Sequence, residues 1–173
     1  MAMVIEAVAG LVPTHRQCTV EIENGCSIYT LCNPRFYTSS GSCTVPFPPT
    51  IASCTSGSAM FSKTPHAACG AVGVFTYDLL NKCTENSSKK LAVMFSVPYD
   101  FNLYSNWYAV GIFDKYKECN YDLYCQMYYD SDRAFVRGKA NGPILNYRGN
   151  EVTIMATMSD TYQPVMKVQV SKN

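Results

Sequence analysis

The fold is constrained most by a series of short apolar or alternating segments that turn residues separate. Residues 70–77 and 91–97 form two strong apolar runs, with a polar stretch at 81–90 between them. Residues 152–158 and 165–170 alternate apolar and polar side chains, as half-buried strands do. Many short strands of this kind predict a mainly β protein, a compact β-sandwich flanked by one or two short helices.

Two further stretches bear on the order of the strands. Residues 19–22 alternate in polarity and are followed by Asn24 and Gly25, a hairpin-type turn, so residues 27–31 are expected to run back beside the first strand. The segment 43–58 is rich in Pro, Ser and Thr. Because Pro cannot donate a ladder hydrogen bond, this segment is predicted to be a surface loop or an edge strand.

A strand is also predicted at residues 107–113, with a short helix over 118–129. Tyr121, Tyr124 and Tyr128 recur there at intervals of three and four residues. That spacing would place the three rings on one face of the helix.

The N-terminal residues favour a short helix, because apolar side chains recur at helical spacing up to Pro13. We expect a short amphipathic segment at 1–13 ahead of a sandwich over 16–173, the two making one domain. No apolar run is long enough to span a bilayer. The start lacks basic residues and Glu6 interrupts it, so we expect no signal peptide and a soluble protein, either cytosolic or released non-classically.

Composition argues against several classes of function. The net charge is +1 and the 14 Lys and Arg residues are scattered, so we expect no nucleic-acid partner. The nine cysteines include no CxxC pair, and only two histidines accompany them, so we expect no metal site and no cofactor. Without an export signal the thiols are expected to be reduced, with an oxidation switch or intermolecular disulfides as the alternative.

An enzyme is not expected either. Ser105 has no evident His and acid partners, and neither His15 nor His66 lies near a convincing nucleophile. Asp130 and Asp132 fit a solvated acidic turn better than a catalytic pair.

Most of the aromatic surface of the chain is concentrated between residues 95 and 129. This stretch contains Tyr99, Phe101, Tyr104, Trp107, Tyr108, Tyr116, Tyr121, Tyr124, Tyr128 and Tyr129. A tyrosine combines an apolar ring with a hydroxyl, which suits a boundary between oil and water. A dense Tyr and Trp patch with few charges indicates a surface for lipid headgroups, sugars or another protein.

Part of this stretch resembles the central motif of the actinoporins, pore-forming cytolysins of sea anemones with relatives in other animals and in plants. The motif is Phe95-Ser96-Val97-Pro98-Tyr99-Asp100-Phe101-Asn102-Leu103-Tyr104-Ser105-Asn106-Trp107. The resemblance extends upstream through 70–74 and 91–93, and downstream through Tyr124, 127–129 and 168–172. The many cysteines and the short N-terminus look most like the actinoporin-like proteins of fish.

The resemblance implies a β-sandwich that binds phosphocholine-containing membranes, sphingomyelin among their lipids, and assembles there into homo-oligomeric, cation-conducting pores. The headgroup pocket that it implies comprises Arg16, Ser40, Val72, Ser96, Pro98, Tyr104, Tyr124, Tyr128 and Tyr129, with Thr38 as an alternative to Ser40. The membrane interface that it implies comprises Leu103, Trp107 and Tyr108.

The chemistry of these residues suits phosphocholine on its own terms. A quaternary ammonium has no hydrogen-bond donor and is held by the faces of aromatic rings, which the pocket tyrosines could supply. The phosphate needs donors such as the Ser96 hydroxyl, tyrosine hydroxyls and Arg16. Tyr99 and Phe101 are expected to be core residues instead.

Three departures from the family pattern modify the expectation. The N-terminal helix expected before Pro13 has about 12 residues and covers roughly 18 Å. This is less than the ~30 Å hydrocarbon core that a pore-lining helix must cross, so lysis is expected to be weak or conditional. Leu103 stands where the toxins typically have Trp, which predicts weaker or differently selective binding. The run Arg137-Gly138-Lys139 replaces an Arg-Gly-Asp motif, so integrin recognition is not expected.

A lectin-like carbohydrate-binding module without pore activity is the alternative hypothesis. The same sandwich resembles fungal fruit-body lectins, and Tyr and Trp rings stack on sugars as readily as they enclose choline. A sugar site would tolerate the loss of Arg16 better, since it needs no partner for a phosphate.

Overall fold

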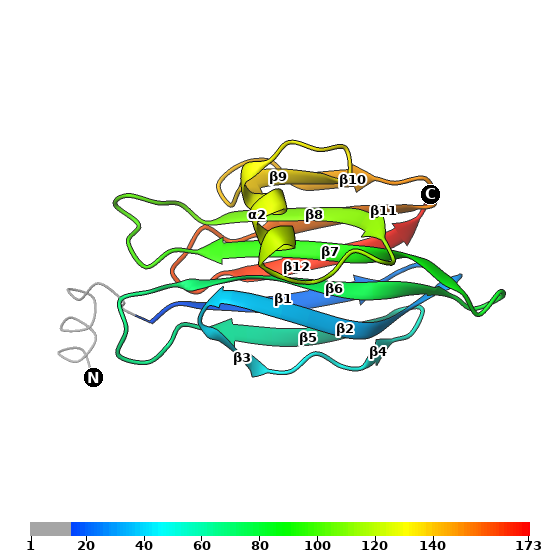
Figure 1. The fold of residues 1–173 in the computed structure, drawn as a ribbon, viewed down its shortest axis with the longest axis horizontal. Coiled ribbons are helices and arrows are strands. Elements are labelled where there is room, and N and C mark those ends of the chain that lie inside the picture. The colour runs from blue at the N-terminus through cyan, green and yellow to red at the C-terminus, as the bar shows by residue number, and fades with distance from the viewer. Residues whose placement is uncertain (1–14) are drawn as a thin grey trace, which may run out of the picture.

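The computed structural model describes residues 15–173, which form a β-sandwich of two six-stranded sheets with one helix on the outer face of one sheet (Figure 1). The predicted mainly β sandwich is confirmed. Within the described residues, no helix is long and apolar enough to cross a membrane. The predicted amphipathic segment at 1–13 lies outside the described residues.

Sheet A has the strand order β10-β11-β12-β1-β5-β3. Its strands are β1 (Gln17–Asn24), β3 (Ser42–Val45), β5 (Thr55–Ser62), β10 (Leu145–Arg148), β11 (Val152–Met158) and β12 (Val165–Lys172). Neighbours are antiparallel except β1 and β12, which are parallel. Burial alternates along β12, so one face of the sheet packs on the core and the other faces solvent.

Sheet B has the order β4-β2-β6-β7-β8-β9 and is antiparallel throughout. Its strands are β2 (Tyr29–Ser40), β4 (Thr50–Ile51), β6 (Ala71–Asn81), β7 (Ser87–Val97), β8 (Trp107–Asp114) and β9 (Phe135–Lys139). The helix, α2 (Tyr121–Tyr129), crosses the strands on the outer face of this sheet (Figure 1).

Strands β6 and β7 are apolar along most of their length because both of their faces are covered. On the inner face, the Phe95 ring packs on Phe61 of sheet A with ring centroids 4.4 Å apart. On the outer face, Val74 and Met94 join Leu123 of α2 in a second buried cluster. This double coverage explains why the sequence signal for these two strands is strong.

The predicted hairpin at Asn24 and Gly25 is wrong, because β1 and β2 belong to different sheets. The buried Asn24 side chain donates from Nδ2 to the carbonyls of Tyr29, at 2.9 Å, and Ile51, at 3.0 Å. The Gly25 amide donates to the Val170 carbonyl at 2.7 Å. These bonds lead the chain from one sheet to the other instead of back along the same sheet.

The segment 43–58 was expected to be a loop or an edge strand, and this is partly correct. β3 and β4 lie at the edges of sheets A and B. The same segment, however, also holds the start of β5, which is an interior strand between β1 and β3.

Candidate functional site

A row of paired residues crosses five strands of sheet B near one end. Ser40 on β2 pairs with Val72 on β6, which pairs with Ser96 on β7. Ser96 pairs with Trp107 on β8, which pairs with Lys139 on β9. Directly opposed residues point to the same face of a sheet. We call these five residues the register row, and it lies on the outer face, since Val72 packs into the cluster beneath α2.

Helix α2 places three predicted pocket residues on the same face of sheet B. The helix begins after Asn120, whose side-chain oxygen accepts from the backbone N–H of Leu123 at 3.0 Å. Its buried side rests on the sheet. Tyr124 is buried, Tyr128 is half-buried and Tyr129 is 70% exposed, so exposure to solvent increases from the first ring to the third. We call these three rings the tyrosine cluster.

The tyrosine cluster is tied to the register row through Ser96. The Tyr124 and Tyr128 rings are stacked with centroids 5.7 Å apart, and Tyr129 meets Tyr128 edge-on at 4.8 Å. Burial raises the pKa of Tyr124, and a side-chain hydrogen bond with Ser96 opposes that shift in part. Tyr124 is therefore a neutral phenol at physiological pH.

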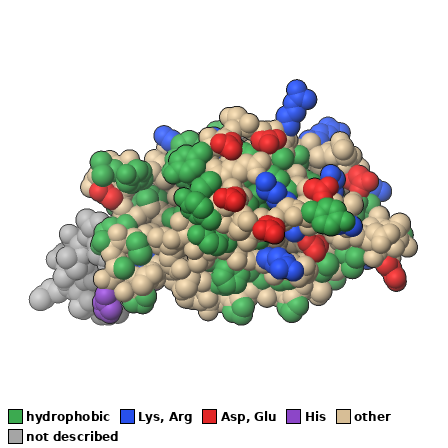
Figure 2. Space-filling view, viewed as in Figure 1, with side chains coloured by type: hydrophobic (Ala, Val, Ile, Leu, Met, Phe, Trp, Pro, Cys, Tyr) green, Lys and Arg blue, Asp and Glu red, His purple; other side chains and the backbone are tan. Residues whose placement is uncertain are grey.

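The loop 98–106 joins β7 to β8 and extends past the end of sheet B at the left of Figure 1. Leu103 and Tyr104 at its tip are 73% and 60% exposed. Burial, followed by the nearby hydroxyls of Tyr129 and Tyr104, raises the pKa of Tyr128. Tyr104 therefore lies within electrostatic range of Tyr128, at the edge of the tyrosine cluster. Figure 2 shows hydrophobic side chains, tyrosines included, gathered over this loop and over α2.

At the β9 end of the register row, a cation lies beside the indole. The Lys139 ammonium is 5.4 Å from the centroid of the half-buried Trp107 ring, and Lys139 itself is exposed. Trp107, which was predicted to lie at the membrane interface, therefore has an apolar ring at the surface with the positive charge of Lys139 next to it.

Arg16 is a buried support for the loop rather than an exposed ligand group. Its side chain is 3% exposed, and its guanidinium donates to the carbonyls of Pro98, at 3.2 Å, and Tyr99, at 2.7 Å. Its charged carbon lies 5.0 Å from the Tyr99 ring centroid, 5.2 Å from that of Phe101 and 4.5 Å from that of Tyr162. Pro98 contributes its carbonyl to this support. Tyr99 and Phe101 were expected in the core, but both are half-buried, and Phe101 packs against the edge of the main core cluster.

Tyr108 does not lie at the surface, which corrects the expectation that it belongs to the membrane interface. Successive strand residues point to opposite faces, so Trp107 faces outward and Tyr108 faces inward. Tyr108 is 1% exposed, and its hydroxyl donates to the Ala156 carbonyl of sheet A at 3.2 Å. Its role in the structure is to join the two sheets.

Arg137 is a site residue that sequence reasoning missed. From β9 it donates to the carbonyls of Met127, at 2.9 Å, and Asp130, at 2.6 Å, at the end of α2. A cation at a helix C-terminus satisfies free carbonyls and favours the helix dipole. Its charge also offsets part of the rise in the pKa of Tyr128. In the sequence, Arg137 stands out only as part of the run Arg137-Gly138-Lys139. That run does not indicate that its side chain binds the end of a helix.

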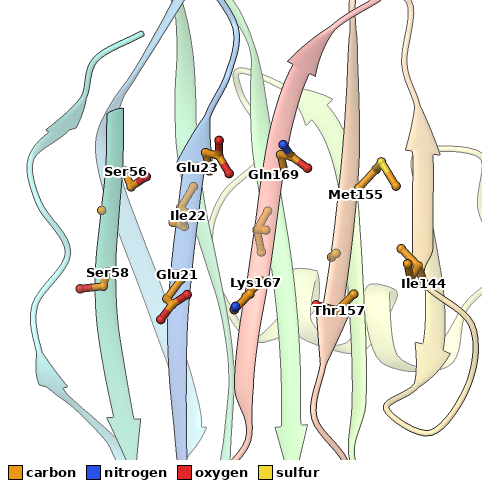
Figure 3. A pocket seen from close by; sticks show the side chains of 13 residues that line it. Glu21, Ile22, Glu23, Ser56, Ser58, Ile144, Met155, Thr157, Lys167 and Gln169 are labelled. Atoms are coloured by element: carbon orange, nitrogen blue, oxygen red, sulfur yellow. The ribbon is translucent and has the colours of Figure 1, made fainter. Parts of the chain in front are cut away.

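A second hollow lies on the solvent face of sheet A, away from the aromatic residues. This groove has a volume of about 620 Å³. Glu21 and Glu23 of β1 point into it beside Lys167 and Gln169 of β12, with Met155 of β11 at one side (Figure 3). It contains no aromatic ring, so the chemistry of a choline site is found at the tyrosine cluster and not here.

Within residues 15–173, no group of three or more His, Cys, Asp or Glu side chains could hold a metal ion. The site is therefore built of rings, hydroxyls and a few cations. Such a set can enclose a quaternary ammonium and donate hydrogen bonds to an anion, and it offers no nucleophile paired with a base.

Comparison of the fold with solved structures identifies two relevant neighbours. The lipid binding protein Nakanori superposes with a TM-score of 0.68 at 11% identity, over 97% of this chain and 75% of that one. A mutated form of the Xerocomus chrysenteron lectin XCL gives a TM-score of 0.52 at 7% identity, over 90% and 97% of the two chains. At these identities the likeness concerns the fold alone.

Sequence comparison is more specific. DELTA-actitoxin-Ucs1a of Urticina crassicornis is 34% identical over 105 residues, which are 61% of this chain and 43% of the toxin. DELTA-alicitoxin-Pse1b of Phyllodiscus semoni is 34% identical over 114 residues, 65% of this chain and 47% of the toxin. The chain thus spans about half the length of the curated relatives that it matches. The model of the sea anemone cytotoxic protein family matches residues 2–172, and the chain belongs to that family.

Proposed function

We propose that this protein binds membranes peripherally by recognising the phosphocholine headgroup of lipids such as sphingomyelin. The observation that carries the proposal is the packing of the Tyr124, Tyr128 and Tyr129 rings beside Ser96 on the outer face of sheet B, with Tyr104 of the loop 98–106 on the side of Tyr128. The trimethylammonium group would lie against the exposed rings of this group. Each ring contributes about 0.5–2 kcal/mol, depending on how far the cation is desolvated.

The phosphate would be held at the border between the rings and the register row. The hydroxyls of Ser96, Tyr128 and Tyr129 can donate to it. Lys139 supplies an exposed positive charge next to Trp107. The family resemblance suggested Arg16 as a phosphate partner. In this proposal Arg16 does not contact the phosphate, and its role is to hold the loop 98–106 in position.

The exposed tip of the loop 98–106 would enter the interface between headgroups and hydrocarbon. Leu103 and Tyr104 are exposed there, and Trp107 follows at the base of the loop. An indole and a phenol favour the headgroup level, whereas Leu103 gains only from contact with hydrocarbon. Oligomeric, cation-conducting pore formation is the second part of the proposal, supported by membership of a cytotoxic protein family.

Vesicle pelleting combined with dye release tests both parts at once. Phosphatidylcholine vesicles with and without sphingomyelin would be mixed with the wild type and with Tyr129→Ala. The matched control is Tyr116→Ala, which removes a ring that is 79% exposed and outside the site. We expect binding that Tyr129→Ala weakens about tenfold, Tyr116→Ala leaves unchanged and soluble phosphocholine displaces.

Each outcome has a distinct meaning. Binding with dye release supports both parts of the proposal, and binding without release supports recognition while rejecting pore formation. The headgroup proposal would be overturned by equal loss in the two variants, or by an absence of binding to either vesicle. Displacement by sugars instead of phosphocholine would favour the lectin-like alternative.

A further inference from the structure

A second pocket lies at the opposite end of the sandwich from the loop 98–106. Its volume is about 360 Å³, which is within the range of small-molecule sites. It is lined by the start of β7, the end of β8, the stretch before β9 and the turn between β10 and β11. Lys89 in this pocket is seven residues from Ser96 along β7, or about 23 Å at ~3.3 Å per residue. We call it the distal pocket.

Three cations from three separate parts of the chain line the distal pocket. They are Lys89 on β7, Arg133 between α2 and β9, and Arg148 on β10. Within residues 15–173, none of these side chains has an ion-pair partner within 4.0 Å or a side-chain hydrogen bond. Their positive charge is therefore available to a ligand.

The acidic side chains around the distal pocket already have other partners. Glu151 lines the pocket, and its carboxylate accepts from the Tyr29 hydroxyl. Asp132 accepts from Gln126 at 3.3 Å and from the Ala134 amide at 3.0 Å.

The third acidic residue is Asp114, which is opposite Lys89 in the β7–β8 register. Its carboxylate accepts from the Tyr116 amide at 3.1 Å. Asp114 and Asp132 thus accept from groups outside the pocket lining, Glu151 accepts from Tyr29 in the lining itself, and none of the three pairs with Lys89, Arg133 or Arg148.

The floor of the distal pocket is apolar. Leu79, Val152 and Tyr29 are buried beneath it, and Ile112 and Tyr147 are half-buried at its side. Burial, together with the charge of Asp132, raises the pKa of Tyr147, so this ring stays neutral. An apolar floor beneath a cationic rim suits a ligand that has both an apolar body and an anionic group.

We propose that the distal pocket binds a small soluble organic anion, whose apolar body rests on the floor and whose phosphate or carboxylate meets Arg133, Arg148 and Lys89. A guanidinium can hold such a group through two parallel hydrogen bonds. The site is separate from the tyrosine cluster, and its occupancy does not require a membrane.

Titration with three matched probes tests this proposal. Phenyl phosphate carries both ligand features, phenol carries only the ring, and inorganic phosphate carries only the anion. Binding would be followed by amide chemical shifts of the turn between β10 and β11. We expect phenyl phosphate to bind at least tenfold more tightly than either single-feature probe. Arg148→Gln and Arg133→Gln should each weaken its binding about tenfold.

Lys167→Gln is the matched control, because it removes an exposed cation that lines the groove on the solvent face of sheet A and does not line the distal pocket. It should leave the affinity for phenyl phosphate unchanged. Equal affinity for phenyl phosphate in the wild type and in the Arg133→Gln/Arg148→Gln double variant would overturn the proposal. So would binding of phenyl phosphate no tighter than that of phenol, or no shifts in the turn at all. The exposed positions of both arginines mean that the variants should fold.

Discussion

The Arg16 guanidinium donates a 2.7 Å hydrogen bond to the Tyr99 carbonyl, which ties the residue just before β1 to the loop that follows β7. The same guanidinium lies among the rings of Tyr99, Phe101 and Tyr162. A buried cation held by carbonyls and ring faces fixes the position of whatever those groups belong to. Here it fixes the base of the loop that presents Leu103 and Tyr104.

Replacement of Arg16 by Gln should therefore destabilise the fold and loosen the loop. The variant loses hydrogen bonds from a charged donor to two carbonyls, and we expect the free energy of unfolding to fall by roughly 2 kcal/mol or more. Urea denaturation measures this loss, and hydrogen exchange of residues 99–105 measures the loosening. Arg35→Gln, which removes an exposed arginine of β2, serves as the control. Equal stability of the two variants would contradict the support role.

Trp107 and Tyr108 are adjacent in sequence and should respond to mutation in opposite ways. Trp107→Ala removes a ring at the interface, so vesicle binding should weaken roughly tenfold with little change in stability. Tyr108→Phe removes the hydrogen bond to Ala156 and should cost about 1 kcal/mol of stability with no effect on vesicle binding. Thermal unfolding and vesicle pelleting of both variants separate the two effects. If Tyr108→Phe folds but binds vesicles more weakly than the wild type, the prediction that Tyr108 takes no part in membrane binding is wrong.

Arg137→Met should weaken lipid binding without touching a ring of the tyrosine cluster. The variant keeps most of the side-chain volume but leaves the carbonyls of Met127 and Asp130 without their donor. We expect the last turn of α2 to exchange its amide hydrogens faster and vesicle affinity to fall several-fold. The matched variant is Arg133→Met, which removes a nearby cation that does not bind α2. If both variants bind vesicles like the wild type, the anchoring role is disproved.

Cys119 should make the fold sensitive to alkaline pH. Burial raises the pKa of this thiol to about 11, above its ordinary value of 9.0. A raised folded-state pKa means that the stabilising contribution is complete below the unfolded pKa and is lost as pH rises through the folded pKa. The free energy of unfolding should therefore fall between about pH 9 and pH 11. Urea denaturation at pH 8 and pH 10.5 should show a smaller drop for Cys119→Ala than for the wild type. Identical drops would show that the thiol does not contribute.

The sequence was most informative where both faces of a strand are buried or where large side chains recur at helical spacing. The apolar runs at 70–77 and 91–97 and the helix over 118–129 were all recognisable for these reasons. The strands β9 and β10 were missed because they are short and carry mixed burial, so neither alternates clearly. Family membership also confirms the expectation that the chain is not an enzyme.

The errors in the fold and in the site came from long-range contacts that local patterns cannot reveal. At Asn24 and Gly25 the chain can turn back along the same sheet or cross to the other sheet. The choice depends on hydrogen bonds to the carbonyls of Tyr29, Ile51 and Val170. In the same way, the inward direction of Tyr108 depends on where β8 begins its alternation. A residue type predicts what a side chain can bind, and only the register decides what it faces.

The register row has a consequence for how the protein matures. A shift of a single residue in any one of the strands would turn its member of the row from the outer face into the core. The same shift would move an inward residue such as Tyr108 out into water. A register error would therefore lower the stability of the fold and also disrupt the site. Molecules with incorrect pairing would therefore lose the outer-face surface and core packing together, and under the proposed function only the correctly paired fold would bind a membrane.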